Sequence, residues 1–462
     1  MYREFAAARV LLPALVLLAP WTFSVAIAQD APAEPDIATT SVHHTLNVTL
    51  DPGEHQITVD DTITLPVDLR RAGATFTLSA ALKISKSEPA VTRSTTDDEA
   101  GARYRLETAP SDGLLRISYS GNVHQGLSDQ KEEYTRGFRE SRGVLGAKGV
   151  YLHGASGWVP GFENRMVRFD LQAQAPAGWR VISQGSGDAG DDGRAHWKAN
   201  LPVEQVYLVG GPLHVERDMA GAVETLVYLH EPDKALSAKY LETTAQYLEM
   251  YRSLIGPYPY GKFALVENFW ETGYGMPSFT LLGPQVIRFP FILHSSYPHE
   301  ILHNWWGNSV FVDYESGNWC EGLTAYMADH LIQEQRGKGD EYRRNTLQKY
   351  RDYVQAERDF PLSEFRSRHS AATEAVGYGK SLMLFHMLRR QIGDEKFREA
   401  LAGFYRAQRG RRASFDDLRK AFESVTKDDL SPFFHQWVDR IGAPILALQN
   451  VRAKAADDGY VL

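Results

Sequence analysis

From residue 41 to about residue 215, apolar and polar residues alternate along the chain with a period of two. The clearest example is the segment 44–50, in which Leu46, Val48 and Leu50 alternate with polar residues. Short runs of this kind recur, separated by Gly, Pro and Asp residues that favour turns. Such alternation is typical of strands with one face in a core and the other in water. The pattern predicts an N-terminal antiparallel β domain over residues 41–215.

After the predicted β domain, the pattern becomes helical. Residues 235–254 carry apolar residues at helical spacing, and a Gly-Pro-Tyr-Pro sequence then ends the helix. Two short apolar runs, at 263–266 and 278–282, are candidate strands of a small sheet. The chain from 298 to about 441 is almost entirely helical in pattern. The sequence therefore predicts an α+β multidomain fold, with a mostly helical second domain over residues 216–443 that contains a small sheet.

The first 28 residues have the three parts of a secretory signal peptide. Arg3 and Arg9 are followed by a short apolar run, and Ala26 and Ala28 give the small-x-small ending of a cleavage site. The alternative is a membrane anchor, but the strongly apolar run is shorter than the roughly 20 residues that span a bilayer. We predict cleavage after Ala28 and export, to a periplasm or to the medium.

Two further segments flank the predicted domains. Residues 29–40 are rich in Ala, Pro and acidic residues, which is typical of a linker. Residues 444–462 return to a strand-like pattern, and we interpret them as a C-terminal tail.

Composition and charge exclude several classes of protein and partner. The 462 residues are 43% hydrophobic and 23% charged, as in ordinary globular proteins. The net charge is −8, so the chain has no basic footprint for nucleic acid or anionic lipid. No other stretch has a transmembrane pattern, so we expect no stable membrane insertion once the signal peptide is removed. The single cysteine, Cys320, excludes an internal disulfide framework and a metal site built of thiolates. The oligomeric state stays open.

The most informative segment is His-Glu-Ile-Leu-His at 299–303. On a helix, His299 and His303 lie on one face and can bind one metal ion, while Glu300 lies beside the ion and suits a base for a metal-bound water. The alternative is a surface helix with two incidental histidines. Apolar neighbours, including Trp305 and Trp306, predict a buried helix instead. Buried imidazoles and a buried carboxylate are costly unless something pairs them, and zinc pairs them.

A catalytic zinc site needs a third protein ligand and one open position. Glu321, on the helix predicted to follow, is the preferred candidate. Asp313 and Glu315 lie in the connecting segment, and Asp329 lies about two helical turns beyond Glu321. Asp329 could instead orient one of the histidines.

The segments 299–308 and 321–326 together resemble the gluzincin zinc aminopeptidases, the family that includes aminopeptidase N and the leukotriene hydrolase. The resemblance implies that one Zn²⁺ is held by His299, His303 and Glu321. It also implies that Glu300 is the general base.

A second segment, 377–382, is similar to the Tyr-x-Lys-Gly segment of the same family, whose tyrosine stabilises the oxyanion. This similarity makes Tyr378 the candidate for that role, although it is one of 22 tyrosines. The resemblance extends over roughly residues 41–444 and implies a thermolysin-like catalytic domain for residues 216–443.

The chain departs from the family at the segment that binds the substrate's amine. The family's Gly-x-Met-Glu-Asn motif is replaced at residues 273–278, where Pro277 occupies the position of the amine-binding glutamate. Proline can neither accept a hydrogen bond through its side chain nor donate one from its backbone. Glu267 and Glu271 are close enough in sequence to substitute. We expect the backbone of the substrate to pair with an edge strand formed by Gly273, Tyr274, Gly275 and Met276.

These observations predict a zinc metallopeptidase that hydrolyses peptide bonds of a peptide or protein substrate, with non-standard recognition of the N-terminal amine. One alternative is an endopeptidase or an enzyme for blocked peptides, which needs no carboxylate for the amine. A second is a non-catalytic scaffold stabilised by zinc, which would be expected to have lost Glu300 or Tyr378. Hydrolysis of a lipid epoxide rests on analogy of fold alone.

Overall fold

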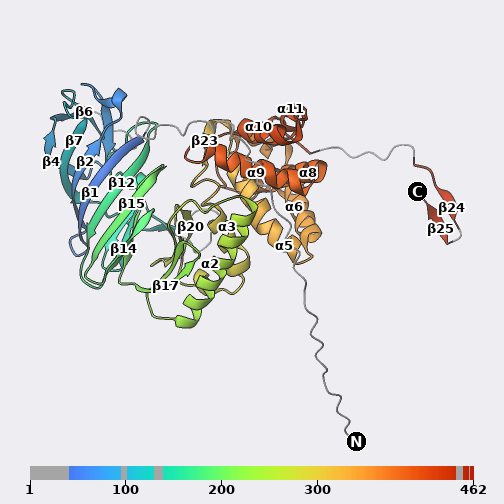
Figure 1. Ribbon diagram of the computed structural model, residues 1–462, viewed down its shortest axis with the longest axis horizontal. Helices are drawn as coiled ribbons and strands as arrows, with labels where there is room; N and C mark the ends of the chain where they lie inside the picture. The colour runs from blue at the N-terminus through green and yellow to red at the C-terminus, as the bar shows by residue number, and fades with distance from the viewer. Residues whose placement is uncertain (1–40, 95–100, 130–138, 444–450, 457, 462) are drawn as a thin grey trace, which may run out of the picture. The chain divides into compact units, whose positions relative to one another are not determined.

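The computed structural model describes residues 41–94, 101–129, 139–443, 451–456 and 458–461 (Figure 1). The predicted signal peptide at 1–28 and the predicted linker at 29–40 lie outside these residues. Within the part of the chain that the structure describes, no helix combines the length and the apolar character needed to cross a membrane.

An N-terminal β domain is followed by a mostly helical domain, as the sequence predicts. The strands of the β domain are β1 (Ser41–Asp51), β2 (Gln56–Thr64), β3 (Thr75–Leu78), β4 (Leu82–Glu88), β5 (Val91–Arg93), β6 (Ala102–Leu106), β7 (Leu114–Asn122), β8 (Ser128–Asp129), β9 (Arg139–Glu140), β10 (Gly143–Gly146), β11 (Gly149–Leu152), β12 (Met166–Gln174), β13 (Arg180–Ile182), β14 (Ser186–Ala189), β15 (Arg194–Val203) and β16 (Leu208–Gly211).

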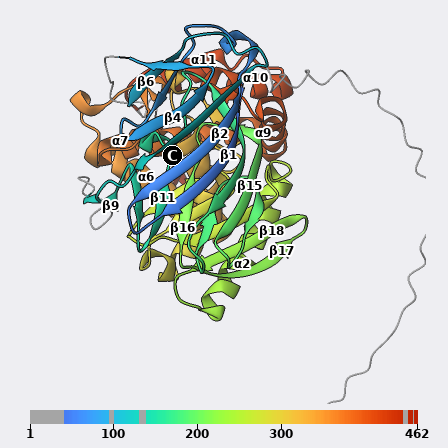
Figure 2. The same ribbon diagram turned by 90° about the vertical axis from the view of Figure 1, so that its left-hand side faces the viewer.

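The largest sheet of this domain has the strand order β14-β15-β12-β1-β2-β7-β4, and Figure 2 shows β15, β1, β2 and β4 across it. A second sheet, β10-β11-β16-β13, joins the same hydrophobic core. Burial alternates along β1, which confirms the period of two seen in the sequence. The strand pairs of this domain are antiparallel except that β1 pairs in parallel with β12.

The next five strands form one sheet with the order β17-β18-β19-β21-β20. They are β17 (His214–Ala220), β18 (Val223–Leu229), β19 (Lys262–Glu267), β20 (Gly273–Met276) and β21 (Phe279–Leu282). Leu226 and Ala264 pack into the core of the β domain, while their neighbours Val227 and Leu265 pack into the core of the helices. Because both faces are buried, β19 is apolar over most of its length. It contains the apolar run 263–266, which the sequence predicted to be a strand.

Helices form most of the rest of the second domain, and the first two of them contact this sheet. They are α2 (Lys234–Leu254), α3 (Ser296–Leu302), α4 (Cys320–Ala325), α5 (Leu331–Gln335), α6 (Gly339–Tyr353), α7 (Ala371–Glu374), α8 (Ser381–Ile392), α9 (Asp394–Gln408), α10 (Phe415–Thr426) and α11 (Ser431–Phe434). The remaining strands form two short ladders, β22 (Phe311–Val312) with β23 (Arg412–Ala413) and, in the tail, β24 (Lys454–Ala456) with β25 (Gly459–Val461).

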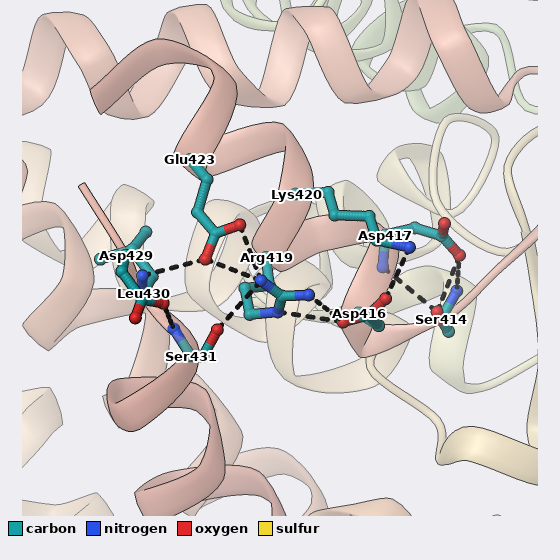
Figure 3. Close-up of polar contacts among 9 residues, drawn as sticks. All are labelled: Ser414, Asp416, Asp417, Arg419, Lys420, Glu423, Asp429, Leu430 and Ser431. Atoms are coloured by element: carbon teal, nitrogen blue, oxygen red, sulfur yellow. Dashed lines mark hydrogen bonds and ion pairs between the residues drawn. The ribbon is translucent and has the colours of Figure 1, made fainter. Parts of the chain in front are cut away.

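The C-terminal end of the helical domain is fixed by polar contacts around α10 (Figure 3). Ser414 caps this helix, and its side chain and backbone exchange hydrogen bonds with Asp417 in a capping box. Arg419 binds the carboxylate of Glu423 one turn away at 2.7 Å and the hydroxyl of Ser431 at 3.2 Å. Because Ser431 begins α11, Arg419 joins the two last helices of the domain.

A buried contact between a histidine and a carboxyl group lies inside the core of the β domain. Nδ1 of His44 lies 2.7 Å from Oδ2 of Asp61, and both side chains are fully buried. Burial raises the pKa of Asp61, while His44 acts to lower it. The hydrogen bond between the two side chains is therefore their one polar contact, because His44 Nε2 and Asp61 Oδ1 have no hydrogen-bond partner among the described residues.

We expect Asp61→Ala to lower the free energy of unfolding by about 1–3 kcal/mol, because it leaves a buried imidazole nitrogen without a partner. The matched control, Asp61→Asn, keeps an oxygen that accepts from Nδ1–H and should lose less than half as much. Urea denaturation followed by circular dichroism measures both values. Equal stability of Asp61→Ala and the unmodified protein would contradict this interpretation.

Candidate metal centre and cavity

The segment 299–303 begins within α3, which is buried as its apolar neighbours predict. Tyr297 and Trp305 are fully buried, and the hydroxyl of Tyr297 hydrogen-bonds Thr244 of α2 at 2.5 Å. The indole nitrogen of Trp305 donates to the backbone oxygen of Gly256 at 3.0 Å. These contacts hold the helix in the core and leave its opposite face, with both histidines, directed at a cavity.

His299, His303 and Glu321 come together as one group. Their side chains are only 12%, 14% and 22% exposed, and Oε2 of Glu321 lies 3.5 Å from Nε2 of His299 and 3.6 Å from Nε2 of His303. These distances are too long for good hydrogen bonds. They agree with the separation of about 3.3–3.6 Å between ligands that bind a tetrahedral zinc ion at about 2.0–2.2 Å.

The chemistry of the three side chains also fits a dication. Burial acts to raise the pKa of Glu321, but the neighbouring imidazoles of His303 and His299 lower it to about 2, so the group is a carboxylate at neutral pH. Its buried Oε2 has no hydrogen-bond partner among the described residues. A divalent ion would satisfy this oxygen and both Nε2 atoms at once.

The other side of each imidazole is also held. Nδ1 of His299 lies 3.0 Å from Oδ2 of Asp329, and Nδ1 of His303 lies 3.1 Å from the backbone oxygen of Trp306. Such contacts place the proton on Nδ1 and leave Nε2 as the ligand atom. Two roles were considered for Asp329, as a metal ligand or as a residue that orients a histidine. Its contact with His299 fits the second role.

Two other candidate ligands do not join the group. The Asp313 side chain accepts from the backbone of Glu315 at 3.3 Å and begins the short turn Tyr314–Ser316. Glu315 is exposed on this turn. The geometry thus selects Glu321 from the candidates that the sequence left open.

Glu300 lies beside the three candidate ligands without joining them. Burial raises the pKa of Glu300, while His303 and His299 act to lower it. A Cβ added at Gly275 would lie 2.2 Å from Oε2 of Glu300, so the strand β20 approaches this carboxylate as closely as its backbone allows. A carboxyl with a raised pKa that faces a substrate-binding strand is suited to take up and return a proton.

Tyr378 lies beside His299, in a π-helical turn between α7 and α8. Its ring lies almost parallel to that of His299, with centroids 6.3 Å apart. Burial raises its pKa well above the usual value, so the hydroxyl keeps its proton. The guanidinium of Arg368 lies 5.5 Å from the centroid of the same ring, a contact that no sequence signal pointed to.

The strand β20 is the edge of the five-stranded sheet and lines a cavity of about 990 Å³. All four residues of the predicted substrate-binding segment line it, and they are Gly273, Tyr274, Gly275 and Met276. His299, Glu300 and Glu321 line the same cavity. Backbone groups on the unpaired side of β20 are therefore available to an extended ligand.

Pro277 and Ser278 form the two-residue turn between β20 and β21, and neither supplies a carboxylate. Ser278 has a φ of 67°, and its N–H donates to Oδ1 of Asn304 at 2.7 Å. Asn304 directly follows the second histidine of the motif, so it ties the turn to the residues of the metal centre. Sequence reasoning missed this role, although the place of Asn304 beside the motif was a signal.

Neither nearby glutamate replaces the missing amine-binding residue. Glu267 is buried, accepts from the backbone of His230 at 2.8 Å and pairs with Arg288 at 2.5 Å. Glu271 accepts from the backbone of Gln285 at 2.9 Å. Neither of them lines the cavity. The suggestion that Glu267 or Glu271 replaces the amine-binding glutamate is therefore wrong.

Part of the chain matches one protein-family model, and several known proteins are similar to it at low identity. Residues 294–437 match the family model described as the Peptidase family M1 domain. The chain is 26% identical to aminopeptidase N of Lactococcus lactis over 174 residues, 36% of this chain and 20% of that protein. It is 20% identical to leucyl aminopeptidase of Saccharolobus solfataricus over 375 residues, 75% of this chain and 47% of that protein. The matches thus span about a fifth to a half of these relatives.

Two solved structures are similar in fold. An M1 zinc metallopeptidase from Deinococcus radiodurans has a TM-score of 0.68 at 18% identity, over 89% of this chain and 97% of that chain. Yeast LTA4 hydrolase has a TM-score of 0.65 at 13% identity, over 89% of this chain and 70% of that chain. The predicted fold, a β domain followed by a helical domain with a small sheet, is confirmed.

We expect Asp329→Ala to weaken zinc binding about 10–100-fold, because His299 then loses the carboxylate that orients its ring. Competition against a fluorescent chelator measures the affinity. Asp313→Ala, which removes a carboxylate from a nearby turn, serves as the control and should bind zinc as the unmodified protein does. An unchanged affinity in Asp329→Ala would show that the contact does not support the metal centre.

Proposed function

We propose that this chain is a zinc-dependent metallopeptidase of the aminopeptidase type, since residues 294–437 match the peptidase family M1 model. The observation that carries the proposal is the convergence of His299, His303 and Glu321 beside the edge strand β20. Zinc bound there would supply a Lewis acid that polarises a carbonyl group and makes water more acidic. The substrate is a peptide or protein.

Residues of the chain bind the substrate, transfer the proton and stabilise the oxyanion. The backbone of β20 binds the substrate in an extended form, which brings one peptide carbonyl next to Glu300. The carboxylate of Glu300 accepts a proton from the attacking water and later donates it to the leaving amine. The hydroxyl of Tyr378 donates a hydrogen bond to the developing oxyanion.

Endopeptidase activity is the second candidate, and Pro277 favours it. A peptidase that cleaves inside a chain needs no carboxylate for a terminal amine, and the expected one is absent from the turn at 277–278. A non-catalytic scaffold is disfavoured, since Glu300 and Tyr378 both lie beside the candidate ligands.

We also propose that the protein is exported to a periplasm or to the medium. The support is the sequence pattern of the first 28 residues, with Arg3 and Arg9 before an apolar run and Ala26 and Ala28 at its end.

We expect Glu300→Gln to reduce kcat for peptide hydrolysis by about 10²–10⁴-fold and to leave one zinc ion bound, because the amide cannot take the proton from water. Chromatography of the products measures the rate, and mass spectrometry of the metal measures zinc content. Glu341→Gln, on the exposed first turn of α6, is the matched control and should retain full activity. Normal turnover by Glu300→Gln would refute its assignment as the base.

A further inference from the structure

Lys262, the first residue of β19, is a buried lysine without a carboxylate partner among the described residues. It is 1% exposed, and its Nζ lies 2.9 Å from Oγ and 3.5 Å from the backbone oxygen of Ser278. Glu224 lies opposite it in the strand register, but that carboxylate lies 3.3 Å from the guanidinium of Arg217. A buried ammonium group without an ion pair destabilises a fold, so stability alone does not explain a lysine at this position.

The surroundings of this ammonium group come from both domains. Nζ lies 4.7 Å from the ring centroid of Trp197 on β15 and 5.5 Å from that of Phe279 on β21. Both distances are within the range of cation–π contacts. Trp197 belongs to the seven-stranded sheet, while Ser278 and Phe279 follow the edge strand β20. Lys262 therefore links the large sheet of the β domain to the turn that ends the substrate-binding strand.

Ser278 has an unfavourable backbone conformation that three groups hold in place. Its φ of 67° lies in the left-handed region, which a serine keeps where its surroundings fix it there. Its Oγ accepts from Nζ of Lys262 and from the backbone N–H of Gly185, 3.0 Å away. Its own N–H donates to Asn304. The ammonium is the charged member of the three, and a charged hydrogen bond is about twice as strong as a neutral one.

The same network of contacts continues to the metal centre. The hydroxyl of Tyr258 lies 3.0 Å from the backbone oxygen of Lys262 and 3.2 Å from Oδ1 of Asn304, and it can donate its proton to either. Asn304 directly follows the second histidine of the motif. Lys262, Ser278, Asn304 and Tyr258 therefore form a closed ring of polar contacts that joins β19, the turn and the metal-binding segment.

The position of β20 relative to Glu300 depends on this turn. A Cβ added at Gly275 would lie 2.2 Å from Oε2 of Glu300, so the two groups have no spare room between them. A peptide backbone paired with β20 therefore meets this carboxylate at a separation that the turn sets. Misplacement of reacting groups by about 1 Å can reduce a rate about 100-fold.

We propose that Lys262 is a positioning residue for peptide hydrolysis, whose ammonium group holds the turn at Pro277 and Ser278 and thereby fixes β20 beside Glu300. This inference rests on the proposed peptidase function. Lys262 does not line the cavity, so it acts through Ser278 and not by contact with the substrate.

The proposal makes the activity depend on the charge of Lys262. Burial lowers the pKa of Lys262 to about 7, while Glu224 of β18 acts to raise it. The residues of β15 and β21 that face Nζ, Trp197 and Phe279, are uncharged. Above about pH 7 the neutral amine loses the charged hydrogen bond to Ser278 and the cation–π contacts. Catalytic efficiency is therefore expected to fall as the pH rises through this value.

The first test is Lys262→Met, which keeps the length of the side chain and removes its charge. This variant no longer buries an unpaired ammonium, so it is expected to unfold at the same urea concentration as the unmodified protein or at a higher one. Loaded with one zinc ion per chain, it is expected to show a kcat for peptide hydrolysis at about pH 6 that is about 10–100-fold lower, with KM changed about threefold or less. Loss of activity without loss of stability separates positioning from a structural role.

The pH profile of kcat/KM is the second measurement, because it reports groups that titrate in the free enzyme. The unmodified protein is expected to show a falling limb with an apparent pKa of about 7, and Lys262→Met is expected to lack this limb. Lys198→Met is the matched control, since Lys198 follows Trp197 on the same strand and its side chain is 52% exposed. This control should keep both the activity and the limb.

Hydrogen exchange of the segment 273–278, followed by mass spectrometry, tests the turn without turnover. Lys262→Met is expected to exchange this segment about 10-fold faster than the unmodified protein, and Lys198→Met at the unmodified rate. Ser278→Ala removes the oxygen that accepts from Nζ and should cause a similar increase. The two substitutions combined should add little to either alone, because they break the same contact.

Four results would overturn the proposal. They are an unchanged kcat in Lys262→Met, unchanged exchange of residues 273–278, a lower urea midpoint that accompanies the loss of activity, and a falling limb that is the same in both proteins or absent from both. Hydrolysis of no peptide by the zinc-loaded unmodified protein would instead refute the proposed function. The exchange measurement would then still decide whether Lys262 holds the turn.

Discussion

The rest of the site depends on one electrostatic constraint, the convergence of two imidazoles and a carboxylate in a nearly closed space. His299, His303 and Glu321 are each less than a quarter exposed, and their ligand atoms lie too far apart to satisfy one another by hydrogen bonds. Buried polar atoms left in this state are costly. Asp329 and the backbone of Trp306 contact Nδ1 of the two imidazoles and fix the orientation of both rings. The arrangement is therefore suited to bind a dication.

The five-stranded sheet holds the substrate-binding strand β20 in a fixed position beside the metal centre. One face packs against the core of the β domain and the other against the helices, so neither face can shift without opening a core. The edge strand β20 is held by this sheet, and its turn is joined to the motif by the contact between Ser278 and Asn304. The close approach of Gly275 to Glu300 follows from these two attachments.

The sequence predicted what depends on local periodicity and on a specific motif. Alternation in β1 and the helical spacing of residues 235–254 identified the two domains, and the spacing of His299 and His303 identified the metal centre. Contacts between distant segments carried no such signal. Glu271 looked suitable because it is near Pro277 in sequence, yet its side chain accepts a hydrogen bond from the backbone of Gln285 and does not line the cavity.

The most direct test of the central claim is zinc K-edge X-ray absorption of the purified protein, together with its zinc content. The account predicts one zinc ion per chain with only nitrogen and oxygen ligands at about 2.0–2.2 Å, including two imidazoles. Absence of stoichiometric zinc would contradict it. So would a sulfur ligand at about 2.3 Å, since Sγ of Cys320 lies 3.4 Å from Nδ1 of His303, on the side of the ring away from the proposed ligand atom.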